Sequence, residues 1–232
     1  MQKGIKFRIY PNREQKNLIH QTLGCCRLIY NRGLAMRKES YEEGKKIGYT
    51  QTSAMLTELK RQEEFAFLKA ADSIALQQSL RDLDRSFVNF FQKRASYPTF
   101  KSKHNRFQSY RTVNQKDNIR IVGRYIKLPK LGFVKIRQSM EVGKINHVTI
   151  EYTPAGKYFA VLNIDFEPEP RPNAGGTIGI DVGIKAFYSD SNGNTVSNPR
   201  YLERSMRKLI REQRRLSRKQ KDSHNRGKQR LR

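Results

Sequence analysis

The hydrophobic residues of this chain change their spacing twice, and this change constrains the fold more than any single motif. Between Gly4 and Tyr10 apolar and cationic residues alternate, which predicts a half-buried strand with a cationic outer face. From Arg13 to about Lys93 the spacing is helical, and from Tyr97 to Phe166 it returns to short strand-like runs. This order predicts an α+β fold in which a small barrel is split by inserted helices.

The helical stretch carries its own start and stop signals. Asn12 followed by Gln15 is typical of a capping box that opens a helix. Gly24 is expected to break that helix, and residues 44–48 are expected to form a turn. The chain therefore resembles a helix-turn-helix at Asn12 to Gly44, which leaves open a DNA-binding role.

One later helix is expected to be strongly amphipathic. Its apolar stripe is typical of core packing and comprises Leu76, Leu80, Leu83, Phe87, Phe90 and Phe91. Gln77, Arg81 and Arg85 lie on or near the polar side. That side either faces solvent or faces nucleic acid.

The strand-like region begins with a segment that interleaves aromatic and cationic residues. Residues 97–107 include Lys101, Lys103 and Arg106, whose charges suit phosphates while neighbouring rings stack on bases. The alternative is an exposed edge strand protected by lysines. Five strands are expected after it, at 119–121, 125–128, 133–136, 148–152 and 159–166.

A linker and a lone carboxylate mark a second domain. Residues 168–176 hold alternating prolines and then two glycines, which predicts a domain boundary. A new strand follows, in which Asp181 is flanked by Ile178, Ile180, Val182 and Ile184. A carboxylate in a buried strand is costly unless it is paired or bound to a metal such as Mg²⁺ or Mn²⁺. An Asp exposed in a turn or on an edge strand is the alternative. Residues 189–194 are expected to form a hairpin turn, and a basic helix is expected after it.

The charge of the chain points to a polyanionic partner. The net charge is +26, from 47 Lys and Arg against 21 Asp and Glu. Such an excess repels itself unless a polyanion neutralises it, which favours nucleic acid. No apolar run approaches the roughly 20 residues that span a membrane, so no membrane partner is expected. Cys25 and Cys26 are the only cysteines, which fits a reducing cytoplasm and argues against a cysteine zinc site.

Several motifs occur in the order seen in one known family. Residues 179–185 resemble the first motif of a RuvC-like, RNase H-fold nuclease. The whole chain resembles the TnpB (OrfB-type) family of insertion-sequence proteins, which are RNA-guided DNA endonucleases. The motifs that carry the resemblance are Tyr10-Pro-Asn, residues 24–31, 75–80, 97–103 and 127–132, and the linker.

The resemblance implies a domain plan and partners. It implies a wedge β-barrel domain at 1–10 and 95–167, a helical recognition domain at 11–94, and the start of a RuvC-like domain at 177–232. It also implies a guide RNA from the transposon end, target DNA beside a short adjacent motif, and a role in transposition and DNA recombination. A prokaryotic cytoplasmic, nucleoid-associated location follows.

The same resemblance suggests individual site residues. Asp181 matches the first metal-binding and catalytic aspartate. Contacts to the adjacent motif fall near Tyr49, Ser53, Ile74, Gln77 and Gln115, and an amide such as that of Gln77 can pair bidentately with adenine. Ile74 and Gln115 differ in residue type from a relative, so the preferred motif is expected to differ.

The chain also departs from the family pattern. The later Glu and Asp of the RuvC-like site and the four-cysteine zinc (Zn²⁺) ribbon have no match here, so the chain is expected to be C-terminally truncated. This chain alone is expected not to cleave DNA, and Asp181 is expected to lack its Mg²⁺ or Mn²⁺ partners. The leading hypothesis is the N-terminal part of an RNA-guided endonuclease, and the second is a nuclease-dead RNA-guided repressor. The third is a DNA-binding transposition accessory that uses the helix-turn-helix at Asn12 to Gly44.

Overall fold

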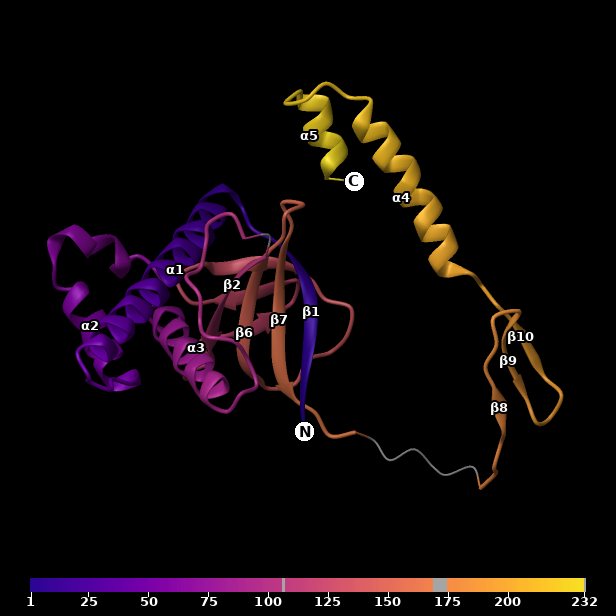
Figure 1. Ribbon diagram of the computed structural model, residues 1–232, viewed down its shortest axis with the longest axis horizontal. Helices are drawn as coiled ribbons and strands as arrows, with labels where there is room; N and C mark the ends of the chain where they lie inside the picture. The colour runs from indigo at the N-terminus through magenta and orange to yellow at the C-terminus, as the bar shows by residue number, and fades with distance from the viewer. Residues whose placement is uncertain (106, 169–174, 232) are drawn as a thin grey trace. The chain divides into compact units, whose positions relative to one another are not determined.

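The computed structural model describes residues 1–105, 107–168 and 175–231. The chain separates into two compact units, Met1–Glu167 and Pro168–Arg232. Figure 1 labels the elements of each unit. Arg106 and most of the predicted linker at 168–176 lie outside the described residues.

The first unit begins with a strand and continues with helices. Its helical elements are α1 (Arg13–Glu42), α2 (Tyr49–Leu59), the 3-10 helix η1 (Glu63–Lys69) and α3 (Ser73–Phe91). The predicted capping box is confirmed, because the Asn12 side chain accepts from the Gln15 backbone and the Gln15 side chain accepts from the Asn12 backbone. α1, α2 and α3 lie together on one side of the sheet in Figure 1.

The predicted break at Gly24 is wrong. α1 runs without interruption through this residue to Glu42. Glycine in a helix costs only about 1 kcal/mol relative to alanine, and the flanking Leu23 and Cys25 are both buried. Tertiary packing of these neighbours therefore outweighs the local preference. The chain turns instead after Glu43, before α2 begins with Gly48 as its N-cap.

The amphipathic stripe of α3 is confirmed over most of its length. Leu76, Leu80, Leu83 and Phe87 are buried. The stripe ends at Phe91, which is 73% exposed, because the last turn of α3 extends beyond the core.

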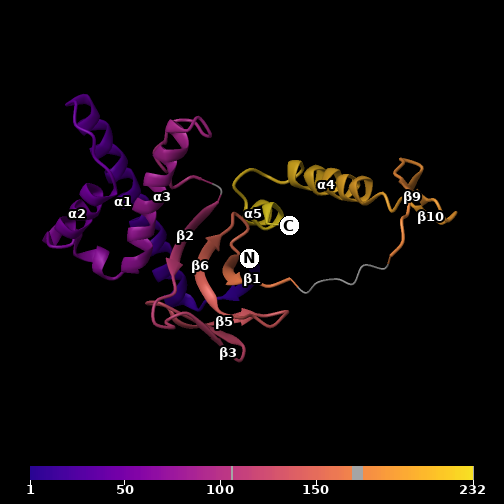
Figure 2. The ribbon, with the colours of Figure 1, turned by 90° about the horizontal axis from the view of Figure 1, so that it is seen from below.

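Seven antiparallel strands form one sheet in the first unit. They are β1 (Gln2–Tyr10), β2 (Gln108–Val113), β3 (Arg120–Val122), β4 (Tyr125–Leu128), β5 (Gly132–Arg137), β6 (Ile145–Tyr152) and β7 (Tyr158–Asp165). The order is β2-β6-β7-β1-β5-β4-β3, so the first strand of the chain pairs between two strands that follow the helices. The sheet curls, as Figure 2 shows, but it keeps two edges and forms a half-barrel. The expected barrel is thus only partly realised.

All five strands expected between residues 119 and 166 are present, but one further strand was not expected. β2 reads Gln-Ser-Tyr-Arg-Thr-Val, in which polar residues mask the alternation. Its inward residues are Tyr110 and Thr112, which are 6% and 1% exposed. The same hydrophobic core contains residues of β1, the helices and the later strands. The helices and the sheet of this unit therefore stabilise each other.

The second unit contains a small sheet and two helices. Its elements are β8 (Ile180–Asp181), β9 (Ala186–Asp190), β10 (Thr195–Ser197), α4 (Tyr201–Ser217) and α5 (His224–Arg230), with the strand order β10-β9-β8. The predicted hairpin turn after Ser189 is confirmed, because both Asp190 carboxylate oxygens accept hydrogen bonds within the turn from Asn192 and Asn194. The predicted basic helix is confirmed as α4. Across the described ranges of the chain, no helix has the length and apolar character to cross a bilayer.

Candidate nucleic-acid interface

Two contacts fix how α2 and α3 lie against each other. Near the start of α2, the Arg81 guanidinium lies 4.4 Å from the centre of the Tyr49 ring. Just beyond the end of α2, the Lys60 ammonium donates to the Ser73 hydroxyl at 3.0 Å. The two helices therefore run antiparallel, with the first turn of one beside the later turns of the other.

This register brings four of the predicted interface residues onto one helix pair. Ser53 lies one turn after Tyr49, and Gln77 lies one turn before Arg81, so Ser53 and Gln77 occupy matching levels of the antiparallel pair. Gln77 is exposed, whereas Ile74, nearly one turn earlier, is half-buried. An exposed amide beside a guanidinium on a rigid helix can meet base edges and phosphate together.

The fifth predicted position lies elsewhere in the first unit. Gln115 is exposed in the connection between β2 and β3, where its backbone carbonyl accepts from Asn118 at 3.1 Å. Among the described residues, Gln115 forms no hydrogen bond with α2 or α3. Its part in the same interface stays a prediction.

An ion pair behind the interface holds the turn that precedes α2. The Arg37 guanidinium donates to Asp84 at 2.6 Å and to the carbonyl of Ile47 at 3.1 Å. It also lies 4.4 Å from the centre of the Phe87 ring. Arg37 thus connects α1, the turn at 44–48 and α3, which sets the position of Tyr49.

The aromatic and cationic segment at 97–105 is a loop bound to α1, and the alternative of an edge strand is wrong. The Asn31 amide donates to the Lys101 carbonyl at 3.0 Å and accepts from the Lys101 backbone amide at 2.8 Å. The Lys101 ammonium lies 4.1 Å from the Tyr30 ring centre, and burial lowers the pKa of Lys101. Lys101 therefore contacts α1 but is exposed overall. Lys103 is also exposed, and its carbonyl accepts a 2.7 Å hydrogen bond from Gln108.

Asp181 does not lie in a buried strand. It belongs to β8, an edge strand of two residues, and it is exposed. The flanking Ile178, Ile180, Val182 and Ile184 are 49–91% exposed. No described residue of β8, β9 or β10 is buried, so no second layer of described residues packs on this sheet. The alternative of an exposed edge-strand Asp therefore describes this structure.

Other carboxylates of the second unit have partners of their own. The Asp190 carboxylate accepts hydrogen bonds in its own turn, and the Asn194 side chain above all lowers the pKa of Asp190. Glu203 and Glu212 lie on α4, where Glu212 accepts from Arg215 at 3.0 Å and from Gln229 at 2.6 Å. Within the described ranges, no group of three or more His, Cys, Asp or Glu could hold a metal ion. The residues present therefore do not fit a catalytic metal pair.

The cysteines do not fit a zinc site either. Cys25 and Cys26 are adjacent on α1, and both are buried. Burial raises the pKa of both thiols, most strongly for Cys26, so the thiolate that zinc requires is disfavoured.

The second unit presents an amphipathic helix with two opposite surfaces. One face of α4 carries cations, namely Arg204, Arg207, Lys208, Arg211, Arg214 and Arg215. The opposite stripe includes Leu202, Met206, Leu209 and Ile210, all 42–76% exposed. The cationic face contributes to the excess of Lys and Arg over Asp and Glu in the chain.

The features described so far are those of one class of protein. The chain is a strongly basic α+β protein with a helix-packed half-barrel, and its charge and exposed amide and aromatic groups are those of nucleic-acid-binding proteins. Two family models match it: the helix-turn-helix domain of IS605 OrfB proteins over residues 1–46, and the IS605 OrfB "Probable transposase" over residues 147–232. The chain belongs to this OrfB/TnpB family, which confirms the relationship indicated by the motifs.

Individual relatives agree with the family assignment. A "Putative RNA-guided DNA endonuclease" of Streptomyces pristinaespiralis is 36% identical over 234 residues, which cover 99% of this chain and 58% of the relative. "Putative RNA-guided DNA endonuclease InsQ" of Escherichia coli is 34% identical over 97% of this chain and 56% of its own length. The chain thus spans less than three fifths of these relatives. A cryo-EM structure of a CRISPR-Cas12f ternary complex matches at 14% identity and a TM-score of 0.44, covering 94% of this chain and 55% of that one.

The helix-turn-helix region has an unexpected form. In residues 1–46 the structure contains β1 and the uninterrupted α1, and the turn lies between α1 and α2. The family match agrees with the predicted helix-turn-helix region, whereas the predicted helix break at Gly24 within that region is wrong.

Proposed function

We propose that this chain binds a guide RNA from the transposon end together with duplex DNA, and that it reads a short motif in that DNA. The proposal rests on the family and on one observation above all. The antiparallel α2–α3 pair places Ser53 and Gln77 at matching levels beside the Tyr49–Arg81 contact. An amide that reads bases and a cation that meets phosphate are the two components of motif recognition.

The motif-reading role can be tested at Gln77. Gln77→Ala is expected to weaken binding to the preferred motif by about 1–3 kcal/mol while leaving binding to other sequences unchanged. Gln78→Ala is a matched control, because Gln78 is the next residue of α3 and is turned by about 100° around the helix. The measurement is a competition titration of the RNA-loaded chain against a library of adjacent motifs. An equal loss on all sequences would show that Gln77 does not read bases.

We further propose that the chain by itself does not cleave DNA. Asp181 is exposed on an edge strand, and the described residues provide no carboxylate cluster beside it. A single carboxylate does not hold two metal ions in the geometry of phosphodiester cleavage. Guide RNA, target DNA and Mg²⁺ are expected to give a specific complex without cuts. Specific cuts that disappear in Asp181→Ala would contradict this expectation.

The same observation favours a second candidate function. A chain that holds guide RNA and occupies DNA without cutting it acts as an RNA-guided repressor. Transcription from a promoter that carries the target and its motif would measure this activity. Repression that requires the guide RNA supports this function, whereas unchanged transcription at full occupancy of the target argues against it.

A further inference from the structure

The solvent-facing side of the half-barrel carries a repeated pattern of rings and cations. Tyr125 pairs across the strands with Lys135, and Lys135 pairs with Tyr10. In the next row Arg137 pairs with Arg8, and Arg8 pairs with Phe159. Lys127 and Phe133 form a third pair. These eight residues, from β4, β5, β1 and β7, are here called the aromatic–cationic face.

The pleat of the strands separates this face from the core. The alternate residues of β5, Val134 and Ile136, are 0% and 4% exposed, whereas Tyr10, Tyr125 and Phe133 are 48–51% exposed. Rings this large are normally buried on a sheet that has a core to receive them. Here the core is already filled by the other side of the same strands, so the rings remain available to a partner.

Cations hold some of these rings in place. The Arg8 guanidinium lies 5.6 Å from the Tyr10 ring centre and 5.2 Å from the Phe159 ring centre. The Lys6 ammonium lies 4.7 Å from the Phe159 ring centre and is paired with Glu151. Tyr10 and Tyr125 flank Lys135 two strand spacings apart, which is roughly 10 Å. The surface therefore presents ring edges and faces with positive charge between them.

Protection of sheet edges does not explain this charge. Lysines on edge strands prevent pairing with other chains, but β1 and β5 are interior strands of the sheet. The sequences of β1, β4 and β5 contain six Lys and Arg and no Asp or Glu. The positive charge is therefore unopposed within these strands.

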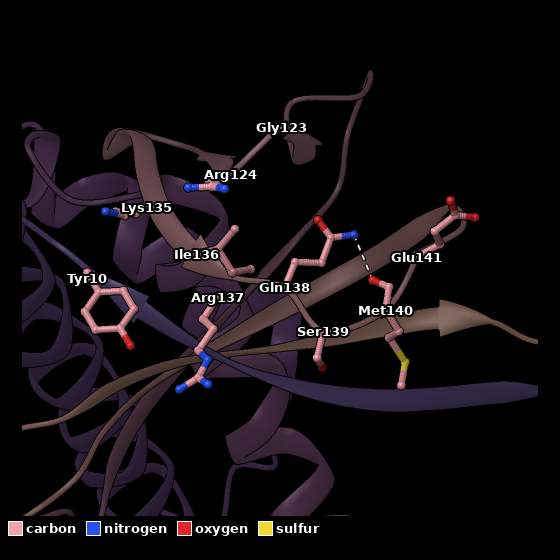
Figure 3. Close-up of a pocket in the computed structure, with 10 residues that line it drawn as sticks. All are labelled: Tyr10, Gly123, Arg124, Lys135, Ile136, Arg137, Gln138, Ser139, Met140 and Glu141. Atoms are coloured by element: carbon pink, nitrogen blue, oxygen red, sulfur yellow. Dashed lines mark hydrogen bonds between the residues drawn. The ribbon is translucent and has the colours of Figure 1, made fainter.

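A groove borders the aromatic–cationic face. It has a volume of about 870 Å³, and Figure 3 shows Tyr10, Arg124, Lys135 and Arg137 gathered toward one end of it. Glu141 lies toward the other end. The cationic end suits phosphate, and the groove is large enough for a nucleotide.

We propose that the aromatic–cationic face and this groove bind unpaired nucleotides of single-stranded RNA, with bases stacked on Tyr10 and Tyr125 and phosphates held by Lys135 and Arg137. Stacking needs unpaired bases, which loops and ends of structured RNA present and which duplex DNA does not. Ser139 and Glu141 line the same groove and offer hydrogen bonds to ribose hydroxyls. This inference rests on the proposed RNA-binding function and names a surface for it that is separate from α2 and α3.

The test measures binding of a fluorescein-labelled twelve-nucleotide oligouridylate to the full chain by anisotropy, beside an RNA duplex of the same length. The double variant Tyr10→Leu/Tyr125→Leu keeps every charge. It is expected to bind the single strand roughly 5- to 100-fold more weakly, with duplex binding and salt dependence unchanged. Tyr10→Phe/Tyr125→Phe keeps the rings and is expected to restore binding. Tyr41→Leu is the matched control, because Tyr41 is 73% exposed on α1, and it is expected to change neither affinity.

The possible results distinguish a failure of the proposed RNA-binding surface from a failure of the proposed RNA-binding function. A wild-type chain that binds no RNA would overturn both proposals. Single-strand binding that survives the Leu substitutions, or a loss that is equal on the duplex, would overturn the aromatic–cationic face alone. An oligodeoxyuridylate that binds as tightly as the RNA would overturn the assignment to RNA.

Discussion

Two glycines of α1 are expected to respond in opposite ways to the same substitution. A Cβ added at Gly33 would lie 2.9 Å from a methyl of Leu80 and 3.0 Å from a methyl of Leu83. Both leucines belong to α3 and are 0% and 1% exposed, so their methyls have little free space to enter. A Cβ added at Gly24 would meet only the end of the Arg27 side chain, at 3.9 Å. Gly33 therefore allows α1 and α3 to approach closely, and Gly24 does not serve such a contact.

The magnitudes follow from two opposing effects. Replacing glycine by alanine inside a helix stabilises it by about 1 kcal/mol. Gly24→Ala is expected to gain this amount. Gly33→Ala gains it too but loses about 1–3 kcal/mol through overpacking against α3. The difference between the two variants is therefore expected to be about 1–3 kcal/mol, because the helix-propensity gain cancels in the comparison.

Urea unfolding followed by far-UV circular dichroism measures this difference. With a slope of about 2 kcal/mol per molar urea, the midpoints of the two variants are expected to differ by roughly 0.5–1.5 M. Combining Gly33→Ala with Leu80→Val should recover part of the loss, since the smaller side chain makes room for the new methyl. The reasoning is refuted if Gly33→Ala raises the midpoint as much as Gly24→Ala does.

Three further predictions concern groups with defined surroundings. Asp84→Ala removes the ion-pair partner of Arg37, whose side chain is 10% exposed, and is expected to lower the free energy of unfolding by about 2 kcal/mol, measured by urea titration; an unchanged midpoint would contradict the pairing. Burial raises the pKa of Cys25 and Cys26, so Ellman's reagent is expected to react with them only after unfolding; rapid labelling of the native chain would contradict their burial. Burial, and to a lesser extent the charge of Arg111, lowers the pKa of His147. The unfolded chain therefore binds a proton at this residue more readily than the folded chain does. The free energy of unfolding is expected to fall as the pH drops below about 6.5. His147→Asn should reduce the loss of unfolding free energy between about pH 7 and about pH 5. If the variant and the wild type have the same pH dependence, His147 is not its cause.

Signals that act over a few residues predicted the local structure well. The capping box at Asn12 and Gln15, the turn around Asp190 and the stripe of α3 depend on neighbours three or four residues apart in the sequence. Each involves contacts that the chain makes with itself at short range. The net charge needs no fold at all, because it is a sum over residues.

Signals that depend on distant partners were misread or missed. The glycine preference at Gly24 is outweighed by packing of α1. β2 has a weak pattern of its own and is a strand because β6 pairs with it. Asp181 has the apolar neighbours of a buried strand, but burial requires a second layer, and none covers its sheet in the part of the chain that the structure describes.

One candidate site was indicated by the sequence, and the other depends on contacts between distant residues. Family motifs pointed to Tyr49, Ser53, Ile74 and Gln77, and the antiparallel register of α2 and α3 relates them in space. No motif joined the residues of the aromatic–cationic face, because Tyr10 meets Lys135 only through strand pairing across the inserted helices. Tyr125 pairs with Lys135 between the consecutive strands β4 and β5.

The sequence by itself thus determined the start of α1, the hairpin turn after Ser189, most strands, the family and the excess of positive charge. The tertiary structure decided which glycine a helix crossing requires, which strands are neighbours and whether a carboxylate is buried. The physical reason is range: propensity, capping and total charge are local or additive, whereas burial and cross-strand register exist only when residues far apart in the chain come into contact.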